Sequence, residues 1–286
     1  MRQPSTNSPG NTPPSRGVMP TLPRSERCHD DGSPTLDVSA RDHDSGSARG
    51  GSRNGVAHRG RTSRNCRMPR MLEVLLNESR GRGWAAGQGT LGQVKLDAAM
   101  LGWTEVPTRR GGPTVSTLRP VDPAEAEPNS LSARYGRGAQ PLHTDGAHLP
   151  HPPDIVVLTC ETTSTTPTRL WHRNNRVGRR AQGLPEFVRH GVFLISSGND
   201  SFFAAACEGR RMRYDPGCML PCDARARQVV QFFEERERFA EEHHWNESGQ
   251  VLLIDNRRVL HARASAAHEP QREIQRLSFH LNHEAS

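Results

Sequence analysis

Residues 141–146 read Pro-Leu-His-Thr-Asp-Gly and place two good metal ligands, His143 and Asp145, two positions apart. In an extended strand the side chains repeat with a period of two, so both ligands project from the same face. An imidazole and a carboxylate on one face make two-thirds of a 2-His-1-carboxylate site, the arrangement that suits non-haem Fe(II). A His-x-Asp triplet is common by chance, so its meaning depends on a third ligand elsewhere.

His261 is the candidate for that third ligand. It lies in a predicted strand, Val259–Arg263, which follows the buried apolar strand predicted over Gln250–Asp255 and a polar corner at 256–258. This setting places the imidazole on the wall of a pocket. Together with His143 and Asp145 it would occupy one face of an octahedral ion and leave the other face open for a bidentate co-substrate and dioxygen.

Two arginines downstream of His261 are candidates for binding that co-substrate. Arg276 lies fifteen residues beyond His261, and Arg272 lies eleven residues beyond it. A guanidinium binds a carboxylate through two parallel hydrogen bonds, so either side chain can hold the distal carboxylate of a dicarboxylic acid.

The pattern of apolar residues predicts a mainly β fold with α decoration. The β-branched run Ile155–Cys160 is the clearest strand, and many short strands with few helices indicate a double-sheet core. Further strands are predicted over 169–172, 191–195 and 276–280, and helices over 71–76, from a Thr90 cap to about residue 102, and from an Asp223 cap to about residue 243. Residues 107–129 read as a loop with one short strand.

The N-terminal arm, residues 1–70, is rich in Ser, Pro, Gly and Arg, and we expect it to be disordered. It carries twelve arginines against six acidic residues, which is +6 of the net charge of +7. The basic character therefore belongs to the arm, and it does not indicate a nucleic-acid partner for the folded domain, which we expect over 71–286. The start of the chain lacks the apolar core of a signal peptide, and no stretch is apolar enough to span a membrane, so we expect a cytoplasmic protein.

Three stretches together resemble the taurine dioxygenase (TauD/TfdA) family, which includes clavaminate-synthase-like and butyrobetaine-hydroxylase-like enzymes. They are the His-x-Asp segment 141–145, the Pro152-Pro153 pair with the strand to Cys160, and Asp-Asn-Arg-Arg-x-x-His-x-Arg over 255–263. The resemblance covers residues 130–286. It implies a double-stranded β-helix, or jelly roll, with Fe(II) as metal and 2-oxoglutarate as co-substrate.

The resemblance also implies roles for individual residues. His143, Asp145 and His261 match the iron ligands, and Arg276 matches the arginine that pairs with the 2-oxoglutarate C5 carboxylate. Thr168 stands where many members have the Thr of a Gly-Gly-Asp-Thr segment, which helps to hold that carboxylate. This chain departs from the family there, because it lacks the two glycines.

The resemblance implies a dioxygenase that releases succinate and CO2 and hydroxylates a small polar metabolite, such as an amino acid or a precursor in antibiotic biosynthesis. Arg263 and His148 are candidate substrate contacts; a structural salt bridge and a surface loop are the alternatives for them. Two other readings stay open. One is a catalytically reduced jelly-roll binding protein, and the other is a zinc hydrolase built on His143, Asp145 and His148.

Overall fold

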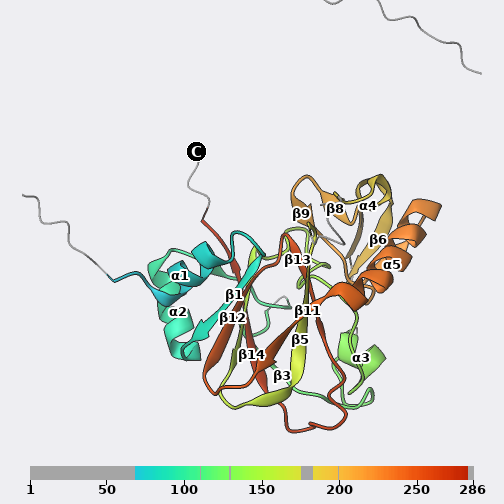
Figure 1. Cartoon of the computed structure of the whole chain (residues 1–286). Coiled ribbons are helices and arrows are strands. Elements are labelled where there is room, and N and C mark those ends of the chain that lie inside the picture. The colour runs from blue at the N-terminus through green and yellow to red at the C-terminus, as the bar shows by residue number, and fades with distance from the viewer. Residues whose placement is uncertain (1–67, 110, 129, 175–182, 199, 283–286) are drawn as a thin grey trace, which may run out of the picture. The chain divides into compact units, whose positions relative to one another are not determined.

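A six-stranded antiparallel sheet forms the centre of the computed structural model, which describes residues 68–109, 111–128, 130–174, 183–198 and 200–282. The order is β1-β12-β4-β14-β2, and β3 also pairs with β14. Its strands are β1 (Trp84–Gln88), β2 (Thr104–Glu105), β3 (Val115–Leu118), β4 (Ile155–Cys160), β12 (Gln250–Asp255) and β14 (Ile274–His280). Strands from both ends of the described chain therefore lie side by side (Figure 1). The predicted disordered arm lies outside the described residues, except for 68–70.

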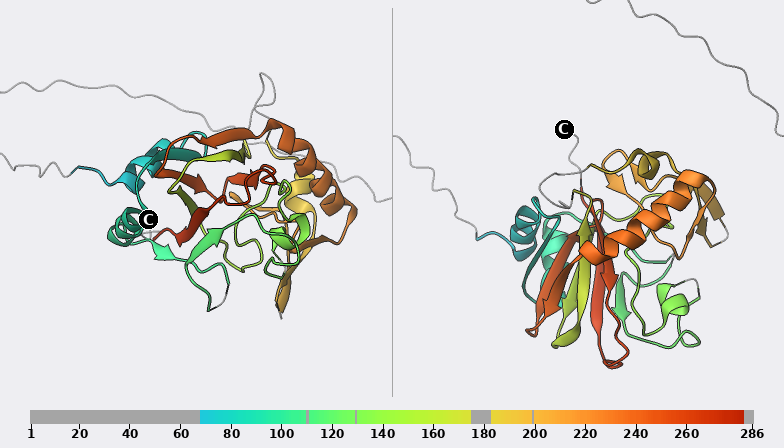
Figure 2. Two further views of the ribbon diagram at one scale, coloured as in Figure 1. Left: turned by 90° about the horizontal axis from the view of Figure 1, so that it is seen from below. Right: turned by 45° about the vertical axis from the view of Figure 1, so that its right-hand side comes forward.

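A three-stranded sheet, in the order β11-β5-β13, packs against the inner face of this central sheet. Its strands are β5 (Ser164–His172), β11 (Glu241–Trp245) and β13 (Val259–Arg263). The two sheets share one apolar core, made by Trp84, Val156, Leu158, Leu252 and Ile254 from the central sheet and Leu170, Trp245 and Val259 from the smaller one. Two antiparallel sheets closed over a common core form the predicted jelly roll, and its strands run alongside one another in Figure 2.

Helices α1 (Met71–Glu78) and α2 (Leu91–Met100) cover the outer face of the central sheet (Figure 1). Because β4 and β12 are thus buried on both faces, each has four consecutive apolar residues, 155–158 in β4 and 251–254 in β12. The Thr90 side chain accepts a hydrogen bond from the Gln93 backbone N–H, which confirms the predicted cap of α2. Among the described residues, no helix combines the length and the apolar character that a membrane crossing needs.

A third layer lies against the outer face of the small sheet. It contains α5 (Ala224–Arg236), whose Val229 and Phe233 pack in one cluster with Trp171 and Leu260 of the jelly roll. The other elements are α3 (Leu131–Tyr135), α4 (Glu186–His190), the 3-10 helix η1 (Glu237–Phe239), the sheet β10-β6-β7 with β6 (Phe193–Ser197), β7 (Asp200–Ala204) and β10 (Met219–Pro221), and the pair β8 (Cys207–Glu208) and β9 (Arg211–Met212). The right-hand view of Figure 2 shows α5 crossing in front of the strands.

The predicted end of the long helix was wrong. We expected the helix to continue to about residue 243, but α5 ends at Arg236 and residues Glu241–Trp245 form β11. This segment is polar and has no strand signal of its own. It becomes a strand because it pairs with β5, where Glu241 lies opposite Leu170 and His243 opposite Thr168.

Candidate metal centre

The three predicted ligands meet between the two sheets of the jelly roll. His143 and His261 form an isolated antiparallel bridge, in which each backbone N–H donates to the other residue's carbonyl at 2.9 Å. Asp145 follows two residues later, and the ligand atoms of all three side chains lie within 4.8 Å of one another. Nε2 of His143 is 4.0 Å from Asp145 Oδ1, and Nε2 of His261 is 3.9 Å from Asp145 Oδ2. The pairing with β13, through a single bridge, therefore replaces the strand expected at 141–145.

Asn256 fixes the backbone of the carboxylate ligand. Its Oδ1 accepts a hydrogen bond from the Asp145 N–H at 3.0 Å, and its Nδ2 donates to the carbonyls of Asp145 at 3.0 Å and Pro153 at 2.9 Å. Asn256 is 1 % exposed, so water could not replace these hydrogen bonds if the amide were removed. Asn256 begins the turn between β12 and β13. Its amide therefore connects the two segments that supply the three ligands.

The electrostatics of His261 and Asp145 suit a divalent cation. Burial lowers the pKa of His261 to about 3, so its imidazole is neutral, which is the form that binds metals. Burial alone would raise the pKa of Asp145, but the positive charge of Arg276 beside it holds this pKa below its ordinary value. Oδ2 of Asp145 is buried and has no hydrogen-bond partner among the described residues. The neutral His261 imidazole facing an ionised, unpaired carboxylate oxygen fits a ferrous ion.

His143 presents its Nε2 to the centre because its other ring nitrogen is occupied. Nδ1 of His143 lies 3.0 Å from the Pro141 carbonyl, a contact in which Nδ1–H donates and leaves Nε2 as the free ligand atom. Nδ1 of His261 is buried without a partner in the described part of the chain.

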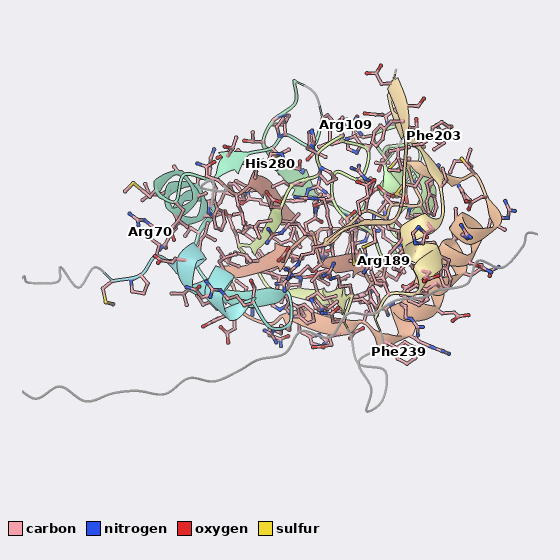
Figure 3. The ribbon with its side chains drawn as sticks, turned by 90° about the horizontal axis from the view of Figure 1, so that it is seen from above. Arg70, Arg109, Arg189, Phe203, Phe239 and His280 are labelled. Atoms are coloured by element: carbon pink, nitrogen blue, oxygen red, sulfur yellow. The ribbon has the colours of Figure 1, made fainter. Side chains whose placement is uncertain are left out.

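Arg276 lies directly beside the ligand carboxylate. Its Nη1 donates to Asp145 Oδ1 at 2.6 Å, and its Nη2 donates to the Thr108 hydroxyl at 3.0 Å. Thr108 lies in the loop between β2 and β3, and in Figure 3 the next residue, Arg109, and His280 at the end of β14 lie on the same side of the molecule. A small cavity opens here, lined by Thr108, Asp145, Leu149, Pro153, Arg276 and Ser278 among others. No pattern in the sequence indicates a role for Thr108, which contacts Arg276 only because β2 and β3 pair with β14.

Thr168 and Arg272 lie further along the interior of the barrel. Thr168 is 4 % exposed and is the cross-strand partner of Arg263, and this pair lies two residues along the strands from the pair of His261 with Leu170. The Thr168 hydroxyl accepts a hydrogen bond from the Trp245 indole N–H at 3.1 Å. Nε of the buried Arg272 donates to the Ser164 hydroxyl, which is on the same strand as Thr168.

Glu269 organises the segment that replaces the family's glycines. Its buried carboxylate accepts hydrogen bonds from the Ser164 hydroxyl at 2.9 Å and from both the N–H and the hydroxyl of Thr166, at 3.0 and 2.8 Å. The sequence did not single out Glu269. Because Ser164 also accepts from Arg272, the acidic and basic side chains are joined through one hydroxyl.

The two predicted substrate residues have structural partners. Nη2 of Arg263 donates to the carbonyls of Gly136 and Gly138 at 2.6 and 2.8 Å, and so it holds the turn after α3. His148 is partly buried, and its Nε2 lies 3.2 Å from the Thr108 carbonyl. His148 does not belong to the ligand group.

A further buried arginine, Arg213, braces the loop that follows Asp145. Its Nη1 donates to the carbonyls of Ala147 and Leu149, both at 2.6 Å, and its Nη2 donates to the Pro150 carbonyl at 2.9 Å. The guanidinium thereby satisfies three backbone groups that β-pairing does not reach. Sequence reasoning missed Arg213, because nothing near it in the chain marks its partners.

Comparisons with known proteins bear on the family and the fold. Residues 170–278 match the model of the family described as "Taurine catabolism dioxygenase TauD, TfdA family", a span that contains His261, Arg272 and Arg276 but not the His-x-Asp segment. No curated protein matches the chain.

Solved structures with similar folds include several oxygenases. Asparagine oxygenase in complex with Fe(II), 3-hydroxyasparagine and succinate is 17 % identical, with a TM-score of 0.57 over 73 % of this chain and 78 % of that one. The non-haem iron oxygenase OrfP, in complex with Fe, succinate and (3S)-hydroxy-L-Arg, is 16 % identical, with a TM-score of 0.52 over 73 % and 77 %. PvcB from Pseudomonas aeruginosa is 16 % identical, with a TM-score of 0.51 over 72 % and 78 %. At these identities the similarity establishes the fold.

Proposed function

We propose that the chain, whose residues 170–278 match the TauD/TfdA family model, is an Fe(II)- and 2-oxoglutarate-dependent oxygenase that hydroxylates a free amino acid or a closely related small polar metabolite. The observation that carries the proposal is the buried group His143, Asp145 and His261, with Arg276 hydrogen-bonded to the carboxylate ligand. These residues lie inside a jelly roll, where both sheets exclude water from the reacting atoms.

His143, Asp145 and His261 hold the metal in this proposal. Fe(II) and 2-oxoglutarate, when bound, supply the oxidative decarboxylation to succinate and CO2 that activates dioxygen for C–H hydroxylation. The chain's own contribution is geometric. Asn256 fixes the backbone of Asp145, and the Pro141 carbonyl fixes the ring of His143, so that the ligand atoms are preorganised.

We assign the two downstream arginines to different ends of the keto acid, which differs from the resemblance, where Arg276 pairs with the C5 carboxylate. Arg276 is 2.6 Å from a metal-ligand oxygen, so an anion that it binds must lie beside the metal. Thr168 lies two residues along β5 from Leu170, the cross-strand partner of His261, which is roughly 7 Å along the strand and matches the length of a five-carbon diacid. The distal carboxylate is therefore assigned to Thr168 and to Arg272, whose buried guanidinium carries a positive charge on the same side of the barrel.

The proposed substrate class rests on the relatives and on the size of the site. Two structures with the same fold are described with hydroxylated amino acids, asparagine in one and arginine in the other. The cavity beside Asp145 is small and combines apolar walls, Leu149 and Pro153, with the charge of Arg276. His148, next to this loop, is the proposed substrate contact, whereas Arg263 is assigned to holding the turn at Gly136.

Anaerobic titration tests the metal and keto-acid assignment. Adding Fe(II) and then 2-oxoglutarate to the wild-type chain should produce the weak visible charge-transfer band of a chelated keto acid. His261→Ala should abolish this band. Absence of the band in the wild type, or an equal band in His261→Ala, would refute the proposal.

A matched pair of variants tests the division between the arginines. Arg272→Met should weaken 2-oxoglutarate binding while leaving 2-oxopentanoate, which lacks the distal carboxylate, nearly unaffected. Arg276→Met should weaken both acids. Succinate release in a screen of amino acids tests the substrate class, and a chain that releases no succinate with any of them would be a binding protein instead.

A further inference from the structure

A row of polar side chains crosses the small sheet inside the barrel. His243, Thr168 and Arg263 are consecutive cross-strand partners on β11, β5 and β13. Two of the three carry a buried nitrogen without a hydrogen-bond partner among the described residues, Nε2 of His243 and Nε of Arg263. Polar atoms buried in this way cost stability unless something pairs with them.

Trp245 occupies one side of the central hydroxyl in this row. The Trp245 side chain is fully buried, packs edge-on against the His243 ring at 4.5 Å, and donates its indole N–H to Thr168 Oγ1. An indole nitrogen can only donate, so Thr168 must accept in this bond. The hydroxyl proton of Thr168 is left to point elsewhere, and no acceptor within the described part of the chain takes it.

The surroundings of this proton favour an anion. Arg263 is partly buried and Arg272 is buried, and the charge of Arg272 adds to burial in lowering the pKa of Arg263 to about 10. Glu269, the acidic side chain beside Arg272, is already engaged by Ser164 and Thr166. A carboxylate entering the barrel would meet positive charge and a hydroxyl that is held as a donor.

We propose that Trp245 is a positioning residue, which orients the Thr168 hydroxyl as a donor to the distal carboxylate of the keto acid. This inference rests on the proposed function. The indole makes no contact with the keto acid in it; it removes the rotational freedom of the hydroxyl before the ligand arrives, so less ordering is needed on binding.

Trp245→Phe is the direct test, with Trp171→Phe as its control. Trp171 is a buried tryptophan of the neighbouring cluster whose indole nitrogen has no partner in the described chain. Trp245→Phe should raise the Kd for 2-oxoglutarate in the Fe(II) complex roughly fivefold, the effect of one ordinary hydrogen bond. It should leave the Kd for 2-oxopentanoate and the affinity for metal within twofold. Trp171→Phe should change none of these constants.

A double-mutant cycle adds a second criterion. In a Thr168→Val background, Trp245→Phe should have no further effect on 2-oxoglutarate binding, because the oriented hydroxyl is already gone. An unchanged Kd in Trp245→Phe, or an equal loss for 2-oxoglutarate and 2-oxopentanoate, would overturn the inference. If the wild type itself gave no keto-acid band, the proposed function would fall, and the inference with it.

If the Trp245→Phe protein does not fold, a measurement on the wild-type chain tests the same inference. Indole N–H signals of 15N-tryptophan-labelled protein can be recorded with Zn(II) in the metal site. The signal that moves in Thr168→Val belongs to Trp245, and it should shift on addition of 2-oxoglutarate but not of 2-oxopentanoate. Equal shifts with both acids would contradict the proposed positioning.

Discussion

Asn256→Ala is the substitution expected to separate metal binding from the rest of the fold. The change removes an amide whose two ends hold the N–H and carbonyl of Asp145 and the carbonyl of Pro153. Asn256 is 1 % exposed, so these three backbone groups lose their partners without access to solvent. Each buried group left unpaired costs about 1–3 kcal/mol, which gives about 4 kcal/mol in total if part of the loss is relieved by relaxation.

The predicted consequences are measurable in two ways. A loss of about 4 kcal/mol in a domain of this size lowers Tm by roughly 10 °C. Removal of a group that supports a metal ligand typically lowers metal affinity by about 10- to 100-fold, because the Asp145 carboxylate is no longer held in place. Differential scanning calorimetry of the metal-free chain and Co(II) titration by calorimetry report the two effects independently.

Asn77→Ala serves as the control, because Asn77 is an exposed residue near the end of α1. It should change Tm by less than 2 °C and leave Co(II) affinity unchanged. If Asn256→Ala lowered Tm but bound Co(II) as tightly as the wild type, the link between this amide and the metal centre would be wrong. If it left both unchanged, the hydrogen bonds themselves would be in doubt.

Three further outcomes follow from buried contacts elsewhere in the fold. Gly83→Ala should lower the free energy of unfolding in urea by about 3 kcal/mol. Gly83 has φ +90°, and an added Cβ would overlap Val259 and lie 2.8 Å from His172 Cδ2. Gly81→Ala, with open space around it, should be neutral. Burial lowers the pKa of His172 to about 4, below its ordinary 6.5, so the unfolded chain binds the proton first and the free energy of unfolding should fall as the pH drops from about 6.5 to about 4. His172→Gln should flatten this part of the pH–stability curve, and His190→Gln on the surface should not. Equal curves for the two variants would contradict the assignment. Arg213→Leu leaves three loop carbonyls without donors and should lower the free energy of unfolding by about 3 kcal/mol, whereas Arg227→Leu at an exposed position should not. An unchanged stability in Arg213→Leu would show that the loop does not need these hydrogen bonds.

The parts of the fold that could be predicted are those whose signal is local. β4 and β12 are buried on both faces and each carries four consecutive apolar residues, and the Thr90 cap of α2 acts within its own first turn. The metal ligands were also accessible, because the family's spacing around His261 is a sequence pattern. None of these depends on knowing which distant segment packs where.

The parts that could not be predicted depend on partners far away in the chain. β11 has the charged, helix-like sequence that follows α5, and only its pairing with β5 makes it a strand. β1, Trp84–Gln88, is built mostly of small residues and takes its strand form from β12. Likewise Thr108 and Glu269 contact the site residues through strand pairing and loop closure. Nothing in the sequence around Thr108 or Glu269 predicts these contacts.

The connection between Asp145 and Asn256 spans 111 positions of the chain, and this has a consequence for the order of folding. The first two ligands belong to a segment that precedes β4, and the third arrives only after β12 and β13 have been added to the two sheets. Closing so long a loop is slow, and it comes after local helices and hairpins have formed. A nascent chain that ends before β13 holds an incomplete ligand set. Uptake of the metal therefore reports that the barrel has closed, and time-resolved Co(II) binding during refolding would follow the last step of folding.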